Sequence, residues 1–260
     1  MAESLEFTTS IPIMGCPVRC KYCPWKEIAE RYNGPRHLTL EQFKRFISTI
    51  PDEKRPYVRI QFGGLSEPHL NPETTDMILY AHELGHPIID FTVLSWLTKE
   101  DCERLKDVPF ENFIVHLPDA EGVSKIPMTD QWTAALKWVI RTVKNRRFMD
   151  MGGEFVSDDS ELIVKGIAPV IHRGRVTCEP IRTPQYSVLP NGDVFFCCQS
   201  KCQDLFIGNL NRFTYQELVS IHKPFAKSLQ SDSKAICRKC KVGQPIWKHK
   251  LMEFYHELFA

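Results

Sequence analysis

Three cysteines, Cys16, Cys20 and Cys23, lie within eight residues near the start of the chain. Thiolates are soft ligands, which select iron–sulfur clusters, zinc or copper(I). A closed zinc site uses four protein ligands, and no fourth Cys or His lies close by in the sequence. Three thiolates on a cubane cluster leave one iron open to a molecule other than protein. The alternatives are a structural zinc knuckle or scattered unligated thiols.

The segment that carries these cysteines reads GCPVRCKYCP, with the spacing C-x3-C-x2-C and an aromatic residue, Tyr22, before the last cysteine. It resembles the signature of the radical S-adenosylmethionine (SAM) enzymes. The resemblance implies that Cys16, Cys20 and Cys23 hold a 4Fe-4S cluster whose open iron chelates SAM, with Tyr22 beside the cofactor. In that family one electron from the cluster cleaves SAM and yields a 5′-deoxyadenosyl radical.

A glycine turn, Gly63-Gly64-Leu65-Ser66-Glu67-Pro68, follows the second expected strand. It resembles the turn of radical SAM proteins in which a strand-end carbonyl accepts from the SAM amino group. Glycine permits that close approach because it lacks a Cβ. The resemblance implies that Gly63, Gly64 and Glu67 contribute to SAM binding. Two residues intervene before Glu67, which departs from the commonest form and leaves the accepting carbonyl unassigned.

Later cysteines form a second set. Cys178 is followed by thirteen residues, Gly192, four residues and Cys197, and Cys237 and Cys240 form a C-x2-C pair. This pattern resembles the auxiliary-cluster extension called SPASM, or its shortened form, Twitch. No cysteine follows Cys240, so the shortened form fits, and the resemblance implies one auxiliary 4Fe-4S cluster held by these four cysteines. A four-cysteine zinc site is the rival interpretation.

Three further cysteines are expected to be structural thiols: Cys102, Cys198 and Cys202. Cys198 neighbours Cys197, and in a strand the two side chains point to opposite faces. Cys202 can replace one of the four expected ligands.

The segments that must position these residues alternate between strand and helix patterns. Strands are expected at 9–15, 57–62, 88–95, 113–117 and 148–155, and helices at 38–50, 71–85, after Thr98 and after Thr129. Such alternation predicts βαβ units and a parallel sheet. Five or six units in roughly 170 residues are too few for a closed eight-fold barrel, so we expect a partial (β/α)5–6 TIM-like barrel. Its chemistry would lie at the carboxyl ends of the strands.

Past Gly174 the pattern changes. The Asn-Gly pair at 191–192, between two short apolar runs, is the strongest short signal for a β-hairpin. A helix opened by Thr214 is expected to stop before Pro224, and the tail from Trp247 is expected to be an amphipathic helix.

The fold prediction is therefore α/β, in two domains. Residues 1–174 form the partial barrel, and residues 175–260 form a small Twitch-like domain with a β-hairpin, the auxiliary cluster and a C-terminal helix. A chain of 260 residues that is 43% hydrophobic can bury a core of this size.

Composition limits the partners. The net charge of +1 provides no field that recruits nucleic acid or an anionic membrane. The start is acidic and lacks the features of a signal peptide, and no apolar run reaches membrane-spanning length. Ten cysteines without a secretion signal favour a reducing compartment, so a cytoplasmic location is expected, with no membrane partner.

Polar residues near other strand ends are weaker candidates. Ser95 ends the third strand, where the family often places a residue that contacts SAM, and a serine bonded to backbone is an equal alternative. His116 and Asp119 end the fourth strand and Glu154 lies near the fifth; each can touch SAM or substrate, and the alternative is a residue that is exposed or caps the strand end.

The resemblance implies a radical SAM oxidoreductase that abstracts one substrate hydrogen. An auxiliary cluster can ligate substrate or accept a second electron, and the latter predicts dehydrogenation of a small molecule, as in the 2-deoxy-scyllo-inosamine dehydrogenases. The first cysteine is already residue 16, which favours a small molecule over a peptide bound by a preceding domain. Flavodoxin or ferredoxin is the expected electron donor. The alternatives are modification of a peptide supplied by a partner and, from another class, a non-catalytic zinc or iron–sulfur module.

Overall fold

The computed structural model describes residues 6–10, 12–21, 23, 25–64, 66–119, 122, 124–150, 172, 174–197, 205–231, 236–238, 240 and 243–259. Five parallel strands form its first part: β1 (Glu6–Ser10), β2 (Val58–Phe62), β3 (Ile88–Thr92), β4 (Asn112–Leu117) and β5 (Arg146–Asp150). They lie side by side in chain order, each parallel to the next. The expected parallel α/β sheet of an open, partial barrel is confirmed.

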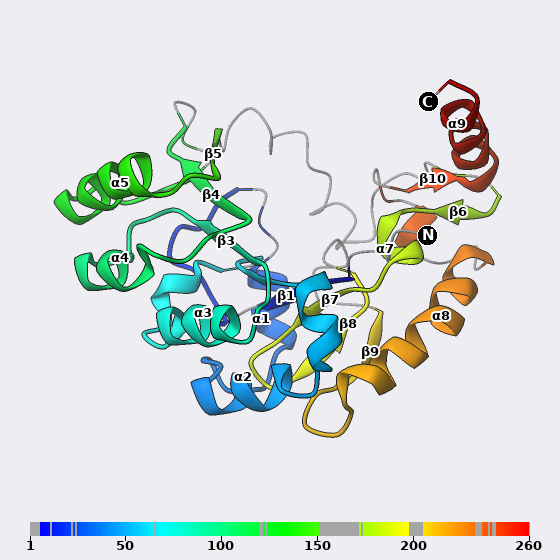
Figure 1. Ribbon diagram of the computed structural model, residues 1–260, viewed down its shortest axis with the longest axis horizontal. Coiled ribbons are helices and arrows are strands. Elements are labelled where there is room, and N and C mark those ends of the chain that lie inside the picture. Colours follow the sequence, from blue (N-terminus) through cyan, green and yellow to red (C-terminus); the bar gives the residue numbers. More distant parts are fainter. Residues whose placement is uncertain are drawn as a thin grey trace.

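Helices connect these strands: α1 (Trp25–Arg31), α2 (Leu40–Ile47), α3 (Thr74–Glu83), α4 (Lys99–Leu105) and α5 (Asp130–Thr142), with the short 3-10 turns η1 (Asp52–Tyr57) and η2 (Pro68–Leu70). Figure 1 shows α2 to α5 along one side of the curved sheet. The ring centroids of Phe43 on α2 and Phe62 on β2 are 5.7 Å apart, so this face of the sheet packs on the helices.

Local capping residues set the starts of three helices, α2, α4 and α5. The hydroxyl of Thr39 accepts from the backbone of Gln42, in a complete capping box before α2. Thr98 and Asp101 form a second capping box before α4, and Thr129 caps α5. These bonds satisfy donors that the first helical turn leaves without a partner.

One predicted helix start is wrong. Helix α3 begins at Thr74, with Glu73 as its N-cap, instead of at Asn71. Asn71 is buried, and its Nδ2 donates to the carbonyls of Pro12 and Leu38, at 2.8 Å each. Long-range bonds therefore use the amide nitrogen of Asn71, while its Oδ1 accepts from the Glu73 backbone N–H at 3.0 Å, just before α3 begins.

The second part begins with β6 (Val176–Thr177), α7 (Glu179–Arg182), β7 (Gln185–Val188), β8 (Asp193–Phe195) and β9 (Phe206–Asn209), and continues through α8 (Tyr215–Ser231), η4 (Ile236–Arg238), β10 (Gln244–Pro245) and α9 (Ile246–Phe259). The predicted hairpin is confirmed as β7–β8, and the tail forms α9 as expected. Strand β7 also pairs in parallel with β1, so one eight-stranded sheet runs in the order β5-β4-β3-β2-β1-β7-β8-β9. The domain division after residue 174 stays a prediction, and this sheet crosses it.

The helix expected to stop before Pro224 does not stop there. Helix α8 runs through this proline to Ser231. Leu218 and His222 on one side of Pro224, and Ala226 and Leu229 on the other, are all buried. An interior proline costs about 3 kcal/mol, and burying each large aliphatic side chain contributes about 1.5–3 kcal/mol. The free energy contributed by burying side chains on both sides of Pro224 therefore outweighs the cost of the proline.

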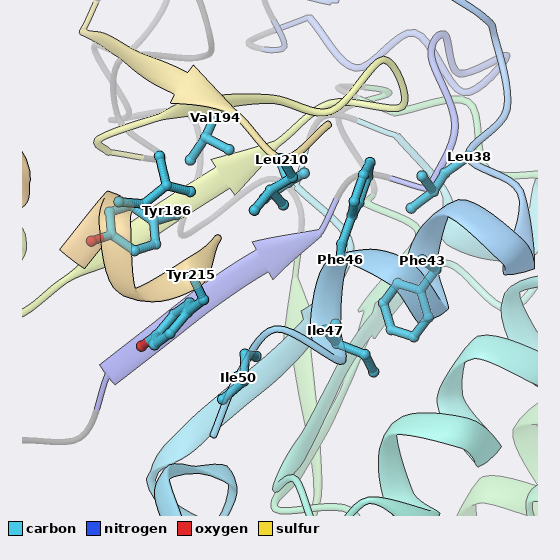
Figure 2. A pocket seen from close by; sticks show the side chains of 11 residues that line it. Leu38, Phe43, Phe46, Ile47, Ile50, Tyr186, Val194, Leu210 and Tyr215 are labelled. Carbon is cyan, nitrogen blue, oxygen red and sulfur yellow. The ribbon is translucent and has the colours of Figure 1, made fainter. Parts of the chain in front are cut away.

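The hairpin packs against α2 around a small apolar cavity of about 30 Å³ (Figure 2). Phe46 and Ile47 line it from α2, and Tyr186, Val194 and Tyr215 line it from the second part of the chain. Its lining is apolar, and it lies within the main core, so it is part of the contact between the two parts. Among the described residues, none of the helices combines the length and apolar character that crossing a bilayer requires.

Candidate functional site

Hydrogen bonds hold the backbone that leads into the first cysteine loop, at the consecutive residues Ile13 and Met14 beyond the carboxyl end of β1. Ser66 Oγ donates to the Ile13 carbonyl at 2.7 Å, from the turn after β2. The backbone N–H of Met14 donates to the Arg36 carbonyl at 2.8 Å, and Arg36 Nε donates back to the Met14 carbonyl at 3.2 Å. The position of Cys16 is thus set by segments on both sides of the loop.

The apex of the loop is held by apolar packing. Val18 is almost fully buried against Val93, which follows β3, and Ile126, which precedes α5; Cys16 and Cys20 border this group. The Lys125 N–H donates to the Val18 carbonyl at 3.3 Å. These contacts place the loop over the carboxyl ends of the strands, where the sequence predicted it.

The loop closes in a tight turn that brings thiols together. The Cys23 N–H donates to the Cys20 carbonyl at 3.0 Å. Burial raises the pKa of the Cys16 thiol to about 11, with smaller contributions from the nearby Glu67 and Cys20 and in spite of backbone hydrogen bonds that lower it. The raised pKa favours the protonated thiol. A bound metal cation reverses this, because it stabilises the thiolate. Cys23 is half-buried, and Tyr22 lies outside the described residues.

The glycine turn after β2 needs glycine for conformational reasons. Gly63 has φ +135° and Gly64 has φ +103°. A Cβ on Gly63 would lie 2.8 Å from the Cβ of Phe91 on β3. The backbone of this turn therefore lies against β3, beside the cysteine loop, at a distance that leaves no room for a Cβ on Gly63.

Glu67 is buried and braces the ends of two strands. Its Oε1 accepts from the Thr92 hydroxyl at 2.7 Å, and its Oε2 accepts from the Val93 N–H at 2.8 Å. Burial raises the pKa of this carboxyl. Below it, His69 and Asp90 form a buried ion pair at 2.9 Å. The roles of Gly63, Gly64 and Glu67 in SAM binding stay predictions. The hydrogen bonds of Glu67 to Thr92 and Val93 also give it a structural role.

The second cysteine set is brought together by a small sheet. Strand β6 pairs antiparallel with β10, with Thr177 opposite Gln244. Cys178 directly follows β6, Cys237 lies in η4, and Cys240 lies shortly before β10. Segments far apart in sequence thus meet at one place.

Three of these thiols influence one another. The pKa of the Cys237 thiol is raised to about 12, chiefly by burial and also by the nearby Cys178 and Cys240. Cys197 is buried two residues after the end of β8 and belongs to the same core as Cys237. This all-thiol donor set suits an iron–sulfur cluster. Cys198 and Cys202 lie outside the described residues.

Cys102 is separate from both cysteine sets. It is buried in α4, and burial raises the pKa of its thiol to about 12, in line with the structural role expected of it. In the described part of the chain, no three or more His, Cys, Asp or Glu side chains converge on a point that would hold a single metal ion. A cubane distributes its cysteines over four iron atoms, so its ligands need not converge on one point.

Two family models match the segments of the chain that carry the two cysteine sets. The family model described as the Radical SAM superfamily matches residues 10–150, more than half of the chain. The chain belongs to the radical SAM superfamily. A second model, described as the SPASM iron-sulfur cluster-binding domain, matches residues 178–241. The cofactors of this radical SAM protein are therefore SAM, a 4Fe-4S cluster and an auxiliary iron–sulfur cluster.

Solved radical SAM structures share the fold. BtrN, in complex with AdoMet and 2-DOIA, is 16% identical, with a TM-score of 0.69 over 95% of each chain. The anSMEcpe structure with bound AdoMet is 14% identical, with a TM-score of 0.56 over 91% of this chain and 83% of that one. SuiB of Streptococcus suis bound to S-adenosylmethionine is 11% identical, with a TM-score of 0.50 over 92% and 71%. No curated protein matches the chain.

The weaker candidates of the radical SAM core lie on neighbouring strands. Ser95 Oγ donates to the Pro127 carbonyl at 2.9 Å, which is the backbone bond of the alternative interpretation, and its contact with SAM stays a prediction. The His116 ring is tilted against that of Phe91, with ring centroids 5.9 Å apart, and burial lowers the pKa of His116 to about 4. Asp119 accepts from the backbone and hydroxyl of Ser124 at 2.9 Å each. Glu154 lies outside the described residues.

Sequence reasoning missed a residue of the auxiliary site. The backbone N–H of His172 donates to the Arg238 carbonyl at 3.1 Å, and its Nε2 donates to the Cys240 carbonyl at 2.9 Å. The imidazole also packs where a side chain on Gly243 would lie. His172 thus fixes the C-x2-C loop to the segment that precedes β6, and no local sequence signal marks it.

Proposed function

We propose that this radical SAM protein dehydrogenates a small molecule, and that Cys16, Cys20 and Cys23 hold the cluster that binds SAM. The observation that carries the proposal is the first cysteine loop, held by hydrogen bonds and by Val18 over the carboxyl ends of β1 to β3. When bound there, the cluster and SAM supply a 5′-deoxyadenosyl radical. The task of the chain is to fix that loop and to present one substrate C–H bond.

We assign the auxiliary cluster to Cys178, Cys197, Cys237 and Cys240. The mutual influence of Cys178, Cys237 and Cys240, together with the buried Cys197, supports this ligand set. Four protein ligands leave no open iron for substrate. The role left to such a cluster is to accept an electron without binding the substrate.

The proposed reaction is a two-electron oxidation. The substrate carbon bears oxygen or nitrogen and loses one hydrogen atom to the deoxyadenosyl radical, which forms 5′-deoxyadenosine. The substrate radical then loses one proton to a base and one electron to the auxiliary cluster, which forms the C=O or C=N bond. One SAM is consumed for each product, and a reductant such as flavodoxin or ferredoxin supplies the starting electron.

The similarity to BtrN supports a small-molecule substrate, because it extends over 95% of both chains and BtrN was solved with 2-DOIA. Peptide modification is the second candidate, and the similarity to anSMEcpe, which was also solved with a Kp18Cys peptide, favours it. A substrate screen separates the two. Anaerobically reconstituted protein with dithionite and SAM should release more 5′-deoxyadenosine with amino sugars than with cysteine- or serine-containing peptides.

The ligand assignment is tested by replacing all three first-set cysteines with Ala. This variant should lose SAM cleavage and keep about half of the iron, because the auxiliary cubane remains. Cleavage at the wild-type rate would refute the assignment.

The oxidative outcome is tested with substrate deuterated at the reacting carbon. Deuterium should appear in 5′-deoxyadenosine and stay there, in an amount equal to the product. Return of deuterium to the product, with SAM regenerated, would indicate isomerisation instead.

A further inference from the structure

The β7–β8 hairpin is packed on both faces. Val188 pairs with Val194, and both line the cavity on the α2 side. Phe195 is the next residue after Val194, so its side chain points to the opposite face. There it enters a separate apolar group on the side of the first cysteine loop.

That group, which we call the bridging cluster, consists of Met14, Ile28, Leu189 and Phe195. None of the four is more than 7% exposed. Met14 lies two residues before Cys16, and Phe195 lies two residues before Cys197. One apolar cluster therefore packs against the approaches to both cysteine sites.

The segment after α1 tightens this contact. Tyr32 packs on the bridging cluster, and its hydroxyl donates to the Pro35 carbonyl at 2.7 Å. A Cβ on Gly34 would lie 2.7 Å from the Cβ of Asn191 at the hairpin tip. Arg36, at the end of this segment, is bonded in both directions to the backbone of Met14. The hairpin tip and the first cysteine loop thus share one short connecting segment.

We propose that the bridging cluster couples the two cofactor sites, so that the first cysteine loop is correctly seated only when the hairpin carrying Cys197 is docked. Met14 cannot move alone because its side chain packs on the hairpin and its backbone is tied to Arg36. Protein interiors are close-packed, so loss of one member displaces its neighbours. The proposal rests on the proposed ligand assignments. Its functional consequence is that SAM binds well only to protein whose auxiliary domain is in place.

The first test uses apoprotein, so it does not depend on bound clusters. Phe195→Ala should accelerate amide exchange in peptides covering residues 12–23 by about tenfold, and Phe195→Leu should restore most of the protection. Phe110→Ala is the matched control because Phe110 is also buried, at 3% exposed against 7% for Phe195, but lies in the main core. Equal exchange of residues 12–23 in Phe195→Ala and Phe110→Ala would overturn the proposal.

The second test uses reconstituted protein. Phe195→Ala should weaken SAM binding by about tenfold with iron content unchanged, measured from the change that SAM causes in the electron paramagnetic resonance spectrum of the reduced cluster. If Phe195→Ala does not fold, Ile28→Val should produce a smaller effect in the same direction, and no effect in that variant would refute the coupling.

Failure of the ligand assignment is a separate outcome. If the triple cysteine variant keeps all its iron while Phe195→Ala still accelerates exchange, the assignment fails and the contact between hairpin and loop stands. If the triple variant behaves as proposed and Phe195→Ala resembles Phe110→Ala, the coupling alone fails.

Discussion

The two cysteine sites are built in different ways. The first gathers Cys16, Cys20 and Cys23 on one loop of eight residues that follows a single strand. The second draws Cys178, Cys197 and the Cys237/Cys240 pair from three segments that lie far apart in the sequence. The first site is local in sequence and needs its surroundings to fix a loop. The second exists only after the β6–β10 pair and the hairpin have formed.

This contrast predicts how each site depends on metal. The proposed ligands of the second site are far apart in the unfolded chain, so we expect metal binding there to be strongly coupled to folding. The first site closes a short loop, which costs little conformational entropy. Removal of a ligand should therefore disturb structure more at the second site than at the first.

The largest expected effect follows from Cys237→Ala. Reconstituted protein should lose about four irons, the content of one cubane, and should unfold at a lower temperature than Cys23→Ala protein. Iron analysis and thermal unfolding measure both quantities. Cys198→Ala and Cys202→Ala are the matched controls and should keep full iron content. Loss of about four irons in either control would mean that the ligand set is misassigned.

A smaller effect is expected from Gly63→Ala at the first site. The left-handed backbone of Gly63 costs about 1–3 kcal/mol for another residue, and the added Cβ would also press on Phe91. We expect lower thermal stability and impaired release of 5′-deoxyadenosine. Gly85→Ala is the control, because Gly85 has φ +85° but open space around it. Equal losses in both variants would show that the contact with Phe91 is unimportant.

His172→Ala should have a moderate effect confined to the second site. It removes the bond to the Cys240 carbonyl, worth about 1 kcal/mol, and leaves the backbone bond to Arg238. Iron occupancy of the auxiliary site should fall, and the spectrum of the SAM-binding cluster should not change. His172→Gln restores a donor and should recover occupancy. If Gln behaves like Ala, the hydrogen bond is not what holds the loop.

Ser95→Ala should have the smallest effect. Loss of the bond to Pro127 costs about 1 kcal/mol of stability, and the KM for SAM should change less than about threefold, since the hydroxyl proton is already donated within the protein. Steady-state kinetics and thermal unfolding separate the two effects. A tenfold rise in KM at unchanged kcat would place the hydroxyl on the cofactor.

Local chemistry made part of the fold predictable. The capping boxes at Thr39 and Thr98 and the turn at 191–192 depend on residues within a few positions, and all three are present. Asn71 and Pro224 were misjudged because distant partners decide their roles. The Asn71 amide nitrogen donates to the carbonyls of Pro12 and Leu38. Pro224 lies inside a helix whose buried face continues beyond it.

The same distinction applies to the site. Cysteine spacing predicts both ligand sets, because the spacing of such ligands can be read directly from the sequence. The residues that hold the loops, such as Val18, Glu67 and His172, act on partners that the fold alone brings close. A valine or histidine of this kind carries no pattern that separates it from an ordinary core residue.

The pairing of β1 with β7 has a consequence for how the protein is made. Phe7 lies opposite Gln185, so the first strand leaves the ribosome long before the strand that covers its outer edge. At 5–20 residues per second, the interval is roughly 10–35 s. During that time an exposed strand edge can pair with another chain. Synthesis of the hairpin ends this exposure, and newly made protein should be most prone to aggregate just before that point.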